Sequence, residues 1–322
     1  MRFVTKCNCF VWHMTPAAIM PTHDGVPASW RTELLYTVLQ RVFELVLLVQ
    51  RSRFFAPGTQ PDETRSYVVR PGLHACRIFR PAGQAKRSTD GKRATGSKLP
   101  LVILVHGGGF VVNTPSRDDP LARFLADCCG CLVVAIDYSK APQARFPTAY
   151  EDVVAICDAV INDPELEVDK TKVVLCGNSA GGNLVLAAAQ DQRLRGRLAG
   201  VTGLYPVVDF ATTVAEKVRL AKRADPAKPD MLASSAGKMN RMYLGAQRVE
   251  LEDVRLSPTF FKAREDLPEN VYLIGVEYDL LCAEAERMAE KLAGSTRKVG
   301  RENGWQAGGM RWGVCEGADA WV

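Results

Sequence analysis

Residues 172–186 constrain the fold of this chain more than any other part of its sequence. Residues 173–175 are β-branched or leucine and predict a buried strand, while residues 183–190 are rich in helix formers. Between them, residues 177–181 have the sequence Gly-Asn-Ser-Ala-Gly, which matches G-x-S-x-G. A strand, a sharp turn and a helix in this order form a nucleophile elbow, where glycines on both sides of the serine avoid a clash. We therefore predict that Ser179 is a nucleophile; a plain glycine-rich turn is the alternative.

Length and composition are those of an ordinary soluble globular protein. The chain has 322 residues, of which 47% are hydrophobic and 24% charged, and its net charge is +5. Part of the positive charge lies in the polar segment 83–98, which is typical of a solvated loop rather than a nucleic-acid groove. The most apolar segment, residues 34–49, is interrupted by Arg41 and Glu44 and is too short to span a bilayer. We expect no nucleic-acid partner, no signal peptide, no transmembrane segment and a cytoplasmic location.

Ten cysteines are scattered through the predicted strands and helices, which differs from a small disulfide framework and favours a reducing compartment. Cys128 and Cys131 form a C-x-x-C, and Cys7 and Cys9 lie far upstream. A zinc site built from these four thiols is one alternative. We favour buried structural cysteines, because the C-x-x-C leads directly into an apolar run. The sequence therefore predicts no metal and no cofactor.

Strand and helix patterns alternate through most of the chain. Residues 67–70 and 75–80, joined through a Pro-Gly pair, predict a hairpin. The other predicted elements are a strand at 99–105, a helix at 118–128, a strand at 132–136, a helix at 148–161, the strand and helix that flank Ser179, strands at 201–204 and 271–275, a helix at 283–292 and a short strand at 310–315. Strands that alternate with helices imply a mainly parallel sheet with helices on both faces, an α/β fold.

Two segments fall outside this alternation. Residues 29–53 carry apolar side chains at helical spacing, and we expect this stripe to pack onto the main domain or over a site entrance. Association with a membrane surface is the alternative. Residues 209–245 lose strand character and become mixed helix and loop. We therefore divide the chain into an irregular segment and cap helix at 1–60 and a main domain at 61–322, with a cap excursion at about 207–255.

A glycine-rich stretch directly follows the predicted strand at 99–105. Residues 106–110 have the sequence His-Gly-Gly-Gly-Phe. Acyl transfer requires backbone amides that approach the substrate closely, and consecutive glycines allow that approach. A phosphate-binding loop is the alternative, but the stretch lacks the Lys-Ser/Thr ending and the G-x-G-x-x-G spacing. We therefore predict an oxyanion hole at this stretch.

Three shorter motifs accompany these two. They are DYSKAPQ at 137–143, FP at 146–147 and EYDLL at 277–281, beside HGGGF at 106–110 and GNSAGG at 177–182. Together they resemble the hormone-sensitive-lipase-like esterases and lipases of the α/β-hydrolase fold, over roughly residues 70–322. The resemblance implies this fold with a helical cap, and carboxylic-ester hydrolysis with Ser179 as the nucleophile. It also implies that Gly108, Gly109 and Ala180 supply the oxyanion-hole amides and that Asp279 is the triad acid.

The general base departs from the family pattern. The triad order Ser, Asp, His places the base after Asp279, yet the four histidines, His13, His23, His74 and His106, all precede it. The family base stands in a phrase resembling Glu-Gly-x-x-His, whereas residues 316–322 are Glu-Gly-Ala-Asp-Ala-Trp-Val. The expected base position is therefore vacant at Ala320, and we expect a truncated C-terminus or a lost histidine. His106 is expected to prop the oxyanion loop, and the other three histidines to be structural or exposed.

Three interpretations follow from these observations. The first is an esterase that acts on small to medium acyl esters, with a role in natural-product tailoring, weakened by the missing base. The second is a non-catalytic protein that binds a small-molecule ligand, as do the gibberellin receptors, which resemble this family and also lack the base. The third is an unstable fragment. A histidine in an extended reading frame would favour the first.

Overall fold

The computed structural model describes residues 34–35, 37–38, 40–42, 58–82, 98–221, 231–301 and 304–316. Their strands are β1 (Glu63–Arg65), β2 (Cys76–Phe79), β3 (Leu99–Val105), β4 (Leu132–Ile136), β5 (Val168–Asn178), β6 (Gly200–Leu204), β7 (Asn270–Val276), β8 (Val299–Arg301), β9 (Gly304–Ala307) and β10 (Met310–Cys315). The helices are α2 (Asp119–Cys129), α3 (Thr148–Asn162), α4 (Ala180–Ala188), α5 (Val214–Leu220), α6 (Met231–Leu244) and α7 (Cys282–Ala293).

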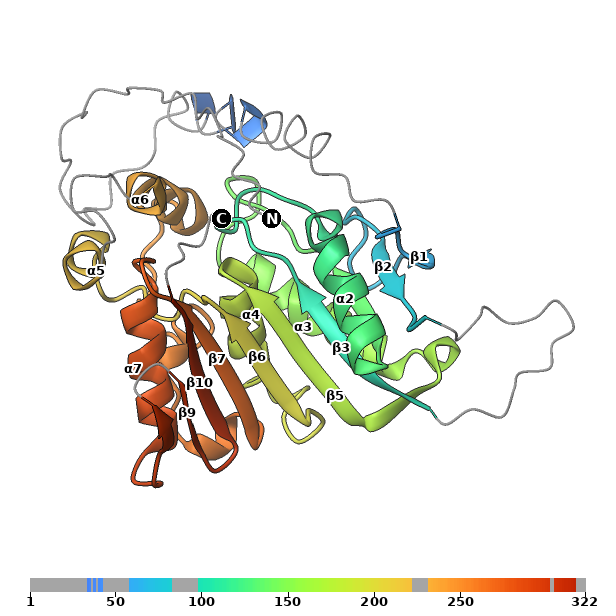
Figure 1. The fold of residues 1–322 in the computed structure, drawn as a ribbon. Coiled ribbons are helices and arrows are strands. Elements are labelled where there is room, and N and C mark those ends of the chain that lie inside the picture. Colours follow the sequence, from blue (N-terminus) through green and yellow to red (C-terminus); the bar gives the residue numbers. More distant parts are fainter. Residues whose placement is uncertain are drawn as a thin grey trace, which may run out of the picture.

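One twisted sheet forms the centre of the molecule, as Figure 1 shows. Its strand order is β1-β2-β4-β3-β5-β6-β7-β10-β9-β8. The strands from β4 to β10 in this order run parallel, and antiparallel strands lie at both ends. The carboxyl ends of β3, β5 and β7 therefore meet at one edge of the sheet, where a site in an α/β fold is expected.

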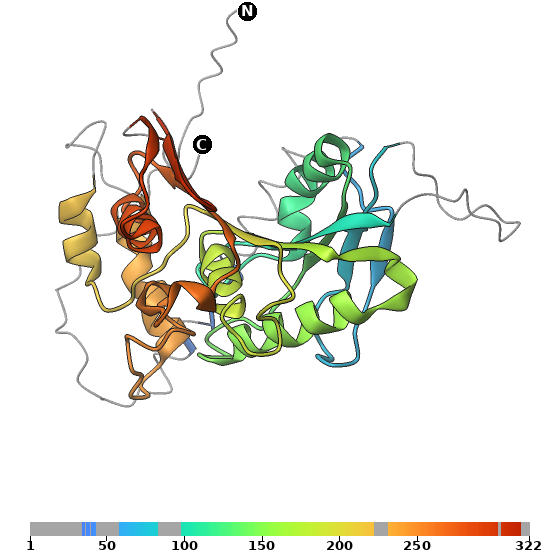
Figure 2. The same cartoon turned by 90° about the horizontal axis from the view of Figure 1, so that it is seen from below.

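Helices cover both faces of this sheet (Figure 2). On one face α2 packs over a small cluster that includes Phe79, Leu104 and Val133. On the other face α3 and α4 pack over the larger cluster that includes Val134 and Leu175. Strands β3 and β4 lie in the middle of the sheet and have continuous apolar sequences, and all residues of β4 are buried. This arrangement confirms the predicted α/β fold and the predicted strands at 99–105 and 132–136.

The sheet edges differ from the sequence prediction. The predicted strand at 67–70 is wrong, because those residues form a turn and β2 pairs instead with β1. The hairpin of β8 and β9 was not expected at all. Of these unpredicted strands, β1 and β8 are the two edge strands of the sheet. Both carry polar or glycine residues, so neither shows an apolar run.

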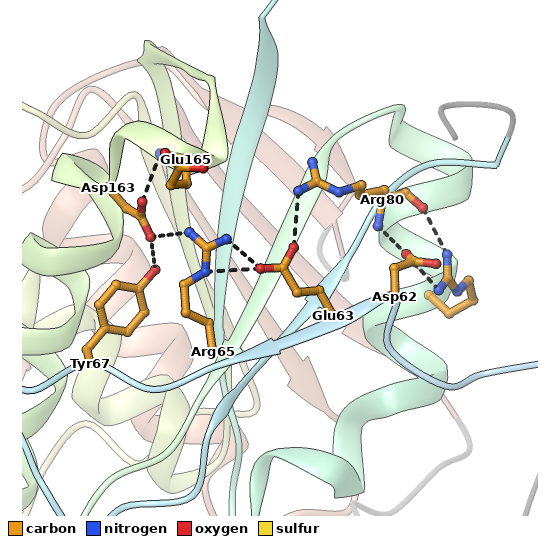
Figure 3. A network of polar contacts seen from close by, with 8 residues as sticks. Asp62, Glu63, Arg65, Tyr67, Arg80, Asp163 and Glu165 are labelled. Carbon is orange, nitrogen blue, oxygen red and sulfur yellow. Dashed lines mark hydrogen bonds and ion pairs between the residues drawn. The ribbon is translucent and has the colours of Figure 1, made fainter. Parts of the chain in front are cut away.

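A polar network ties β1 to the end of α3 (Figure 3). Asp163, directly after α3, accepts hydrogen bonds from Arg65 Nη1 (2.7 Å) and the Tyr67 hydroxyl (2.8 Å) through the same oxygen. Arg65 also pairs with Glu63 of its own strand, and Glu63 contacts Arg80. Although burial opposes its ionisation, the bonds from Arg65 and Tyr67 hold the pKa of Asp163 below its usual value. The edge strand is thus attached through charges rather than through apolar packing.

The structure describes only part of the N-terminal helix, at residues 34–35, 37–38 and 40–42. The predicted apolar stripe residues Leu35, Val38 and Val42 are 54%, 50% and 51% exposed. The buried residue is instead Gln40, whose amide donates to the Val111 carbonyl at 2.8 Å. The described part of this helix therefore contacts the main domain through the polar side chain of Gln40, while the rest of the predicted stripe lies outside the described residues.

Helices α5 and α6 lie between β6 and β7, within the predicted cap excursion, and Figure 1 shows them beyond the end of the sheet where β5 passes into α4. Within the described ranges, no helix has both the length and the apolar character needed to cross a bilayer. The predicted irregular segment before residue 34, most of the basic segment 83–98, Cys7, Cys9 and Ala320 lie outside the described residues.

Candidate active site

Ser179 stands at a sharp turn between β5 and α4. Its backbone has φ +50° and ψ −117°, an unfavourable conformation for a residue with a side chain. A Cβ placed on Gly177 would lie 2.3 Å from the Gly181 carbonyl oxygen, and one on Gly181 would lie 2.1 Å from that of Val105. Only glycine fits at either position. The predicted strained turn is confirmed, and the nucleophilic role of Ser179 stays a prediction.

The predicted oxyanion loop, residues 106–110, follows β3, which pairs with β5. A Cβ placed on Gly107 would lie 3.2 Å from the Ser179 Cβ, so this loop runs directly beside the serine. Gly108 and Gly109 have φ of +129° and +59°, which favour glycine. Ala180 is the first residue of α4 on the other side of Ser179. The fold thus brings all predicted amide donors to the same edge of the sheet.

His106 supports the oxyanion loop from within. Its ring Nδ1 lies 2.7 Å from the Gly107 carbonyl oxygen and its Nε2 lies 3.1 Å from Oδ1 of Asp137. The ring stacks on Tyr138 with centroids 4.5 Å apart, and the Tyr138 hydroxyl donates to the His106 carbonyl at 3.2 Å. Asn113 adds a second bond to the Gly107 carbonyl at 3.2 Å. These contacts fix the orientation of the first peptide units of the loop.

Asp137 organises the charges behind this loop. It accepts from the His74 backbone amide at 3.1 Å, from His106 and from the Lys140 ammonium group. Burial opposes ionisation, but the hydrogen bond from His106 and the nearby charge of Lys140 hold the pKa of Asp137 well below its usual range. Lys140 of the DYSKAPQ motif thus has a partner in the fold. Its spacing from Asp137 carried no signal in the sequence, because the i, i+3 rule applies to helices and residues 137–140 are irregular.

Asp279 follows β7 at the same edge as Ser179 and is buried. Its Oδ1 accepts a hydrogen bond from the Leu281 backbone amide at 3.0 Å. Between β5 and β7, at the end of β6, lies Tyr205, whose φ is +38°. Burial, with the carboxylates of Asp118 and Asp279, raises the pKa of the Tyr205 phenol to about 12. Tyr205 could not be predicted as a site residue from the sequence, since a lone tyrosine after a strand belongs to no motif.

The two described histidines lie away from the region between Ser179 and Asp279. Both ring nitrogens of His106 contact oxygens of Gly107 and Asp137. His74 is exposed and precedes β2, which β4, β3, β5 and β6 separate from β7. Neither side chain is therefore placed to relay a proton from Ser179. His13 and His23 lie outside the described residues.

Helix α6 contacts the oxyanion loop directly. Tyr243 stacks on Phe110 with centroids 4.0 Å apart and rings 4° from parallel. A Cβ placed on Gly109 would lie 2.2 Å from the Met239 sulfur. The Tyr243 carbonyl also accepts from the Phe146 amide at 3.0 Å. Helix α6 thus covers the loop through an aromatic stack and a close methionine contact.

The cysteine prediction is correct for Cys131, which is buried, and wrong for Cys128, which is exposed at the end of α2. The apolar run that follows starts only at residue 131, two residues after the last residue of α2, so it does not bury Cys128. In the part of the chain that the structure describes, no three His, Cys, Asp or Glu side chains are grouped so that they could hold a metal ion.

Comparisons with known proteins identify a family model and relatives that match this chain. The Abhydrolase_3 family model, of alpha/beta hydrolase fold, matches residues 102–304. An arylesterase from Saccharolobus solfataricus is 33% identical over 197 residues, which are 60% of this chain and 61% of the arylesterase. The match therefore spans about three fifths of that relative's length.

Solved structures share the fold. An alpha/beta hydrolase enzyme from the metagenome of Lake Arreo, Spain, has a TM-score of 0.66 and 25% identity, over 80% of this chain and 78% of its own. A hyperthermophilic esterase from the archaeon Pyrobaculum calidifontis has a TM-score of 0.62 and 27% identity, over 83% and 85%. Because the family model spans the chain from β3 to β9 and solved esterases share its sheet, this protein belongs to the Abhydrolase_3 family, the hormone-sensitive-lipase-like esterases of the α/β-hydrolase fold.

Proposed function

We propose that the protein is a carboxylic-ester hydrolase of the serine type that acts on small to medium acyl esters. The observation that carries the proposal is the strained Ser179 at the end of β5 with the glycine-rich loop directly beside it. Asp279 is the triad acid in this proposal. The N-terminal helix with α5 and α6 forms the cap over the acyl pocket of the 61–322 domain. The Saccharolobus arylesterase, an ester hydrolase by name, supports the reaction class.

The chemistry is nucleophilic acyl transfer. The Ser179 oxygen attacks the ester carbonyl carbon, and the negative charge that develops on the carbonyl oxygen is stabilised by the amides of Gly108, Gly109 and Ala180. Collapse of the tetrahedral intermediate releases the alcohol and leaves an acyl group on Ser179. Water then releases the carboxylic acid. Both steps require a base that removes a proton from the attacking oxygen.

Neither of the described histidines, His74 and His106, is placed to act as that base. Removal of the histidine from a serine triad lowers turnover on the order of 10⁶-fold, and the oxyanion hole with binding alone leaves roughly 10³–10⁴ over water. The 322-residue chain is therefore a slow esterase in this proposal. In this proposal the small to medium acyl esters are natural products that the protein tailors.

A second candidate is a non-catalytic ligand-binding protein on the same scaffold. The observation that favours it is His106, whose two ring nitrogens are occupied by Gly107 and Asp137. In this case a small carboxylate or ester would bind under α6 without being turned over. The Ser179→Ala variant would then bind that ligand as tightly as the unmodified chain.

The test is turnover of an activated short-chain aryl ester by the purified chain and by Ser179→Ala. Slow turnover that Ser179→Ala abolishes supports the esterase. Equal turnover by both proteins would show that Ser179 is not the nucleophile. Turnover at ordinary esterase rates of about 1–10³ s⁻¹ would show that another base operates.

A further inference from the structure

Asp118 is a buried acid beside the nucleophile turn that the chemistry above does not use. It ends the short 3-10 helix Pro115–Asp118 and is 8% exposed. Its Oδ1 accepts a hydrogen bond from the Asn178 side-chain amide at 3.1 Å. Among the described residues its Oδ2 has no hydrogen-bond partner. Burial raises the pKa of this carboxyl. A buried acid with one unsatisfied oxygen destabilises a fold, so stability alone does not explain its presence.

Asn178 is the residue directly before Ser179 and connects Asp118 to the oxyanion loop. A Cβ placed on Gly107 would lie 2.6 Å from the Asn178 side-chain oxygen and 3.0 Å from its carbonyl oxygen. The Asn178 side chain therefore fills the space between the 3-10 helix and Gly107. With its amide nitrogen held by Asp118, its oxygen faces the loop, and Gly107 can approach only because it has no side chain.

The oxyanion donors come from two separate segments. Gly108 and Gly109 lie on the loop after β3, and Ala180 begins α4 after β5. Each donor must lie about 2.7–3.1 Å from the same oxygen atom, so the spacing of the two segments decides whether the hole can form. The Asp118–Asn178 bond and the Asn178–Gly107 contact lie at the junction of these segments.

We propose that Asp118 is a positioning residue, which holds Asn178 against Gly107 and thereby sets the spacing between the two halves of the oxyanion hole. The role of Gly108, Gly109 and Ala180 as donors to an oxyanion rests on the proposed function. The positioning of Asn178 by Asp118 does not. Asp118 acts as a hydrogen-bond acceptor in this role, and its charge is not required. An asparagine at this position therefore performs the role, and an isosteric leucine does not.

The neighbouring Asp119 provides a matched control. It is also buried, but both of its carboxylate oxygens bind Arg77 of β2, away from the serine. Loss of that ion pair should lower the stability of the fold without changing the oxyanion loop. The Asp119→Asn variant therefore separates a general loss of stability from a loss of positioning.

The first measurement is hydrogen exchange of the peptides that cover residues 106–113 and 177–183. We expect Asp118→Leu and Asn178→Ala to raise exchange in both peptides on the order of tenfold, because a buried hydrogen bond is lost. The double variant should show no larger rise than either single variant, since both remove one contact. Asp118→Asn and Asp119→Asn should leave both peptides protected. Unchanged exchange in Asp118→Leu or in Asn178→Ala, or an equal rise in Asp119→Asn, would overturn the proposal.

The second measurement is the rate at which a fluorophosphonate labels Ser179. Asp118→Leu should slow labelling of the folded protein about 10²-fold, the effect expected of a small misplacement at a reacting centre. Asp118→Asn should restore the labelling rate. If the unmodified chain is not labelled at all, the proposed function fails, while hydrogen exchange still decides the positioning role. Equal labelling of the unmodified chain and Asp118→Leu would overturn that role.

Discussion

The Nε2 atom of His106 lies 3.1 Å from Oδ1 of Asp137, on the side of β3 that faces β4. Asp279 follows β7, which lies beyond β5 and β6 on the other side of β3. His106, the first residue of that loop, is therefore held away from Asp279, the acid proposed for the triad. In this chain His106 supports the loop, so a nucleophilic Ser179, as proposed, would need another group to accept its proton.

The first prediction concerns that missing group. Replacing Ala320 by histidine, within a family-like C-terminal extension, should raise turnover of an activated short-chain aryl ester by several orders of magnitude. The reason is that the serine hydroxyl is a weak nucleophile until a base removes its proton, and triad histidines contribute up to about 10⁶-fold. Steady-state turnover of the extended and unmodified chains measures the effect.

Two controls accompany this experiment. The same extension with Ala320 retained separates the effect of the histidine from that of added chain. Ser179→Ala in the extended protein should abolish the gain. A gain that persists without Ser179 would show that the new histidine acts on its own.

The second prediction concerns the charge behind the loop. Asp137→Asn should lower the unfolding free energy by about 3 kcal/mol near neutral pH, because it leaves Lys140 and His106 without their buried carboxylate. The pKa of Asp137 is lowered in the folded state, so its contribution is present above the unfolded pKa and is lost as the pH falls through the folded value. The difference between the two proteins should therefore shrink below about pH 4.

Denaturant unfolding at neutral and at acid pH measures this difference. The exposed Glu252 has no hydrogen bond or ion pair assigned to it within the described ranges, so Glu252→Gln provides the control. That variant should change stability by less than about 0.5 kcal/mol at either pH. An equal loss for Asp137→Asn at both pH values would mean that packing, and not charge, explains its effect.

Sequence patterns predicted the centre of the sheet and missed its edges. Strands β3 and β4 are buried on both faces, so each is a continuous apolar run. Strands β1 and β8 lie at the two edges, where polar side chains meet solvent and other charges. A polar strand of three residues has no periodicity that distinguishes it from a loop. Its partner becomes evident only in the fold.

The candidate site divides in the same way. Ser179 and the glycines at 107–109 were evident from sequence because backbone strain and close approach demand particular residues at fixed local spacing. Asp118 was not, because its partner Asn178 is 60 residues away in the chain. The Met239 contact with Gly109 likewise joins an unpatterned segment to a motif. Long-range polar and packing contacts leave no local pattern.

The third prediction tests the contact between α6 and the oxyanion loop. Gly109→Ala should slow ester turnover by about 10²-fold, since its Cβ would lie 2.2 Å from the Met239 sulfur and the loop or α6 must shift. Adding Met239→Ala should recover part of that loss. Gly130 has a φ of +60°, nearly the same as the +59° of Gly109, but a Cβ placed on Gly130 would have no other atom within 4 Å.

Gly130→Ala therefore measures backbone strain alone. It should lower the unfolding free energy by roughly 1 kcal/mol and leave turnover of the folded protein unchanged. Turnover and denaturant unfolding of all four proteins separate the two effects. If adding Met239→Ala to Gly109→Ala restores none of the lost turnover, then strain in the loop explains that loss and the contact with α6 does not.

The last prediction concerns the charged attachment of β1. Asp163→Ala should lower the unfolding free energy by about 2 kcal/mol, because its carboxylate, 9% exposed, accepts from both Arg65 and Tyr67. Asp158→Ala is the matched control, since the Asp158 side chain, which pairs with Arg197, is 39% exposed and the pair should contribute less than about 1 kcal/mol. The pKa of Asp163 is lowered by folding, so its contribution should disappear as the pH falls below about 4. Denaturant unfolding of the three proteins at neutral and acid pH decides the matter. Equal losses for the two variants would mean that burial adds nothing to the Asp163 network, and that β1 is held by its pairing with β2 alone.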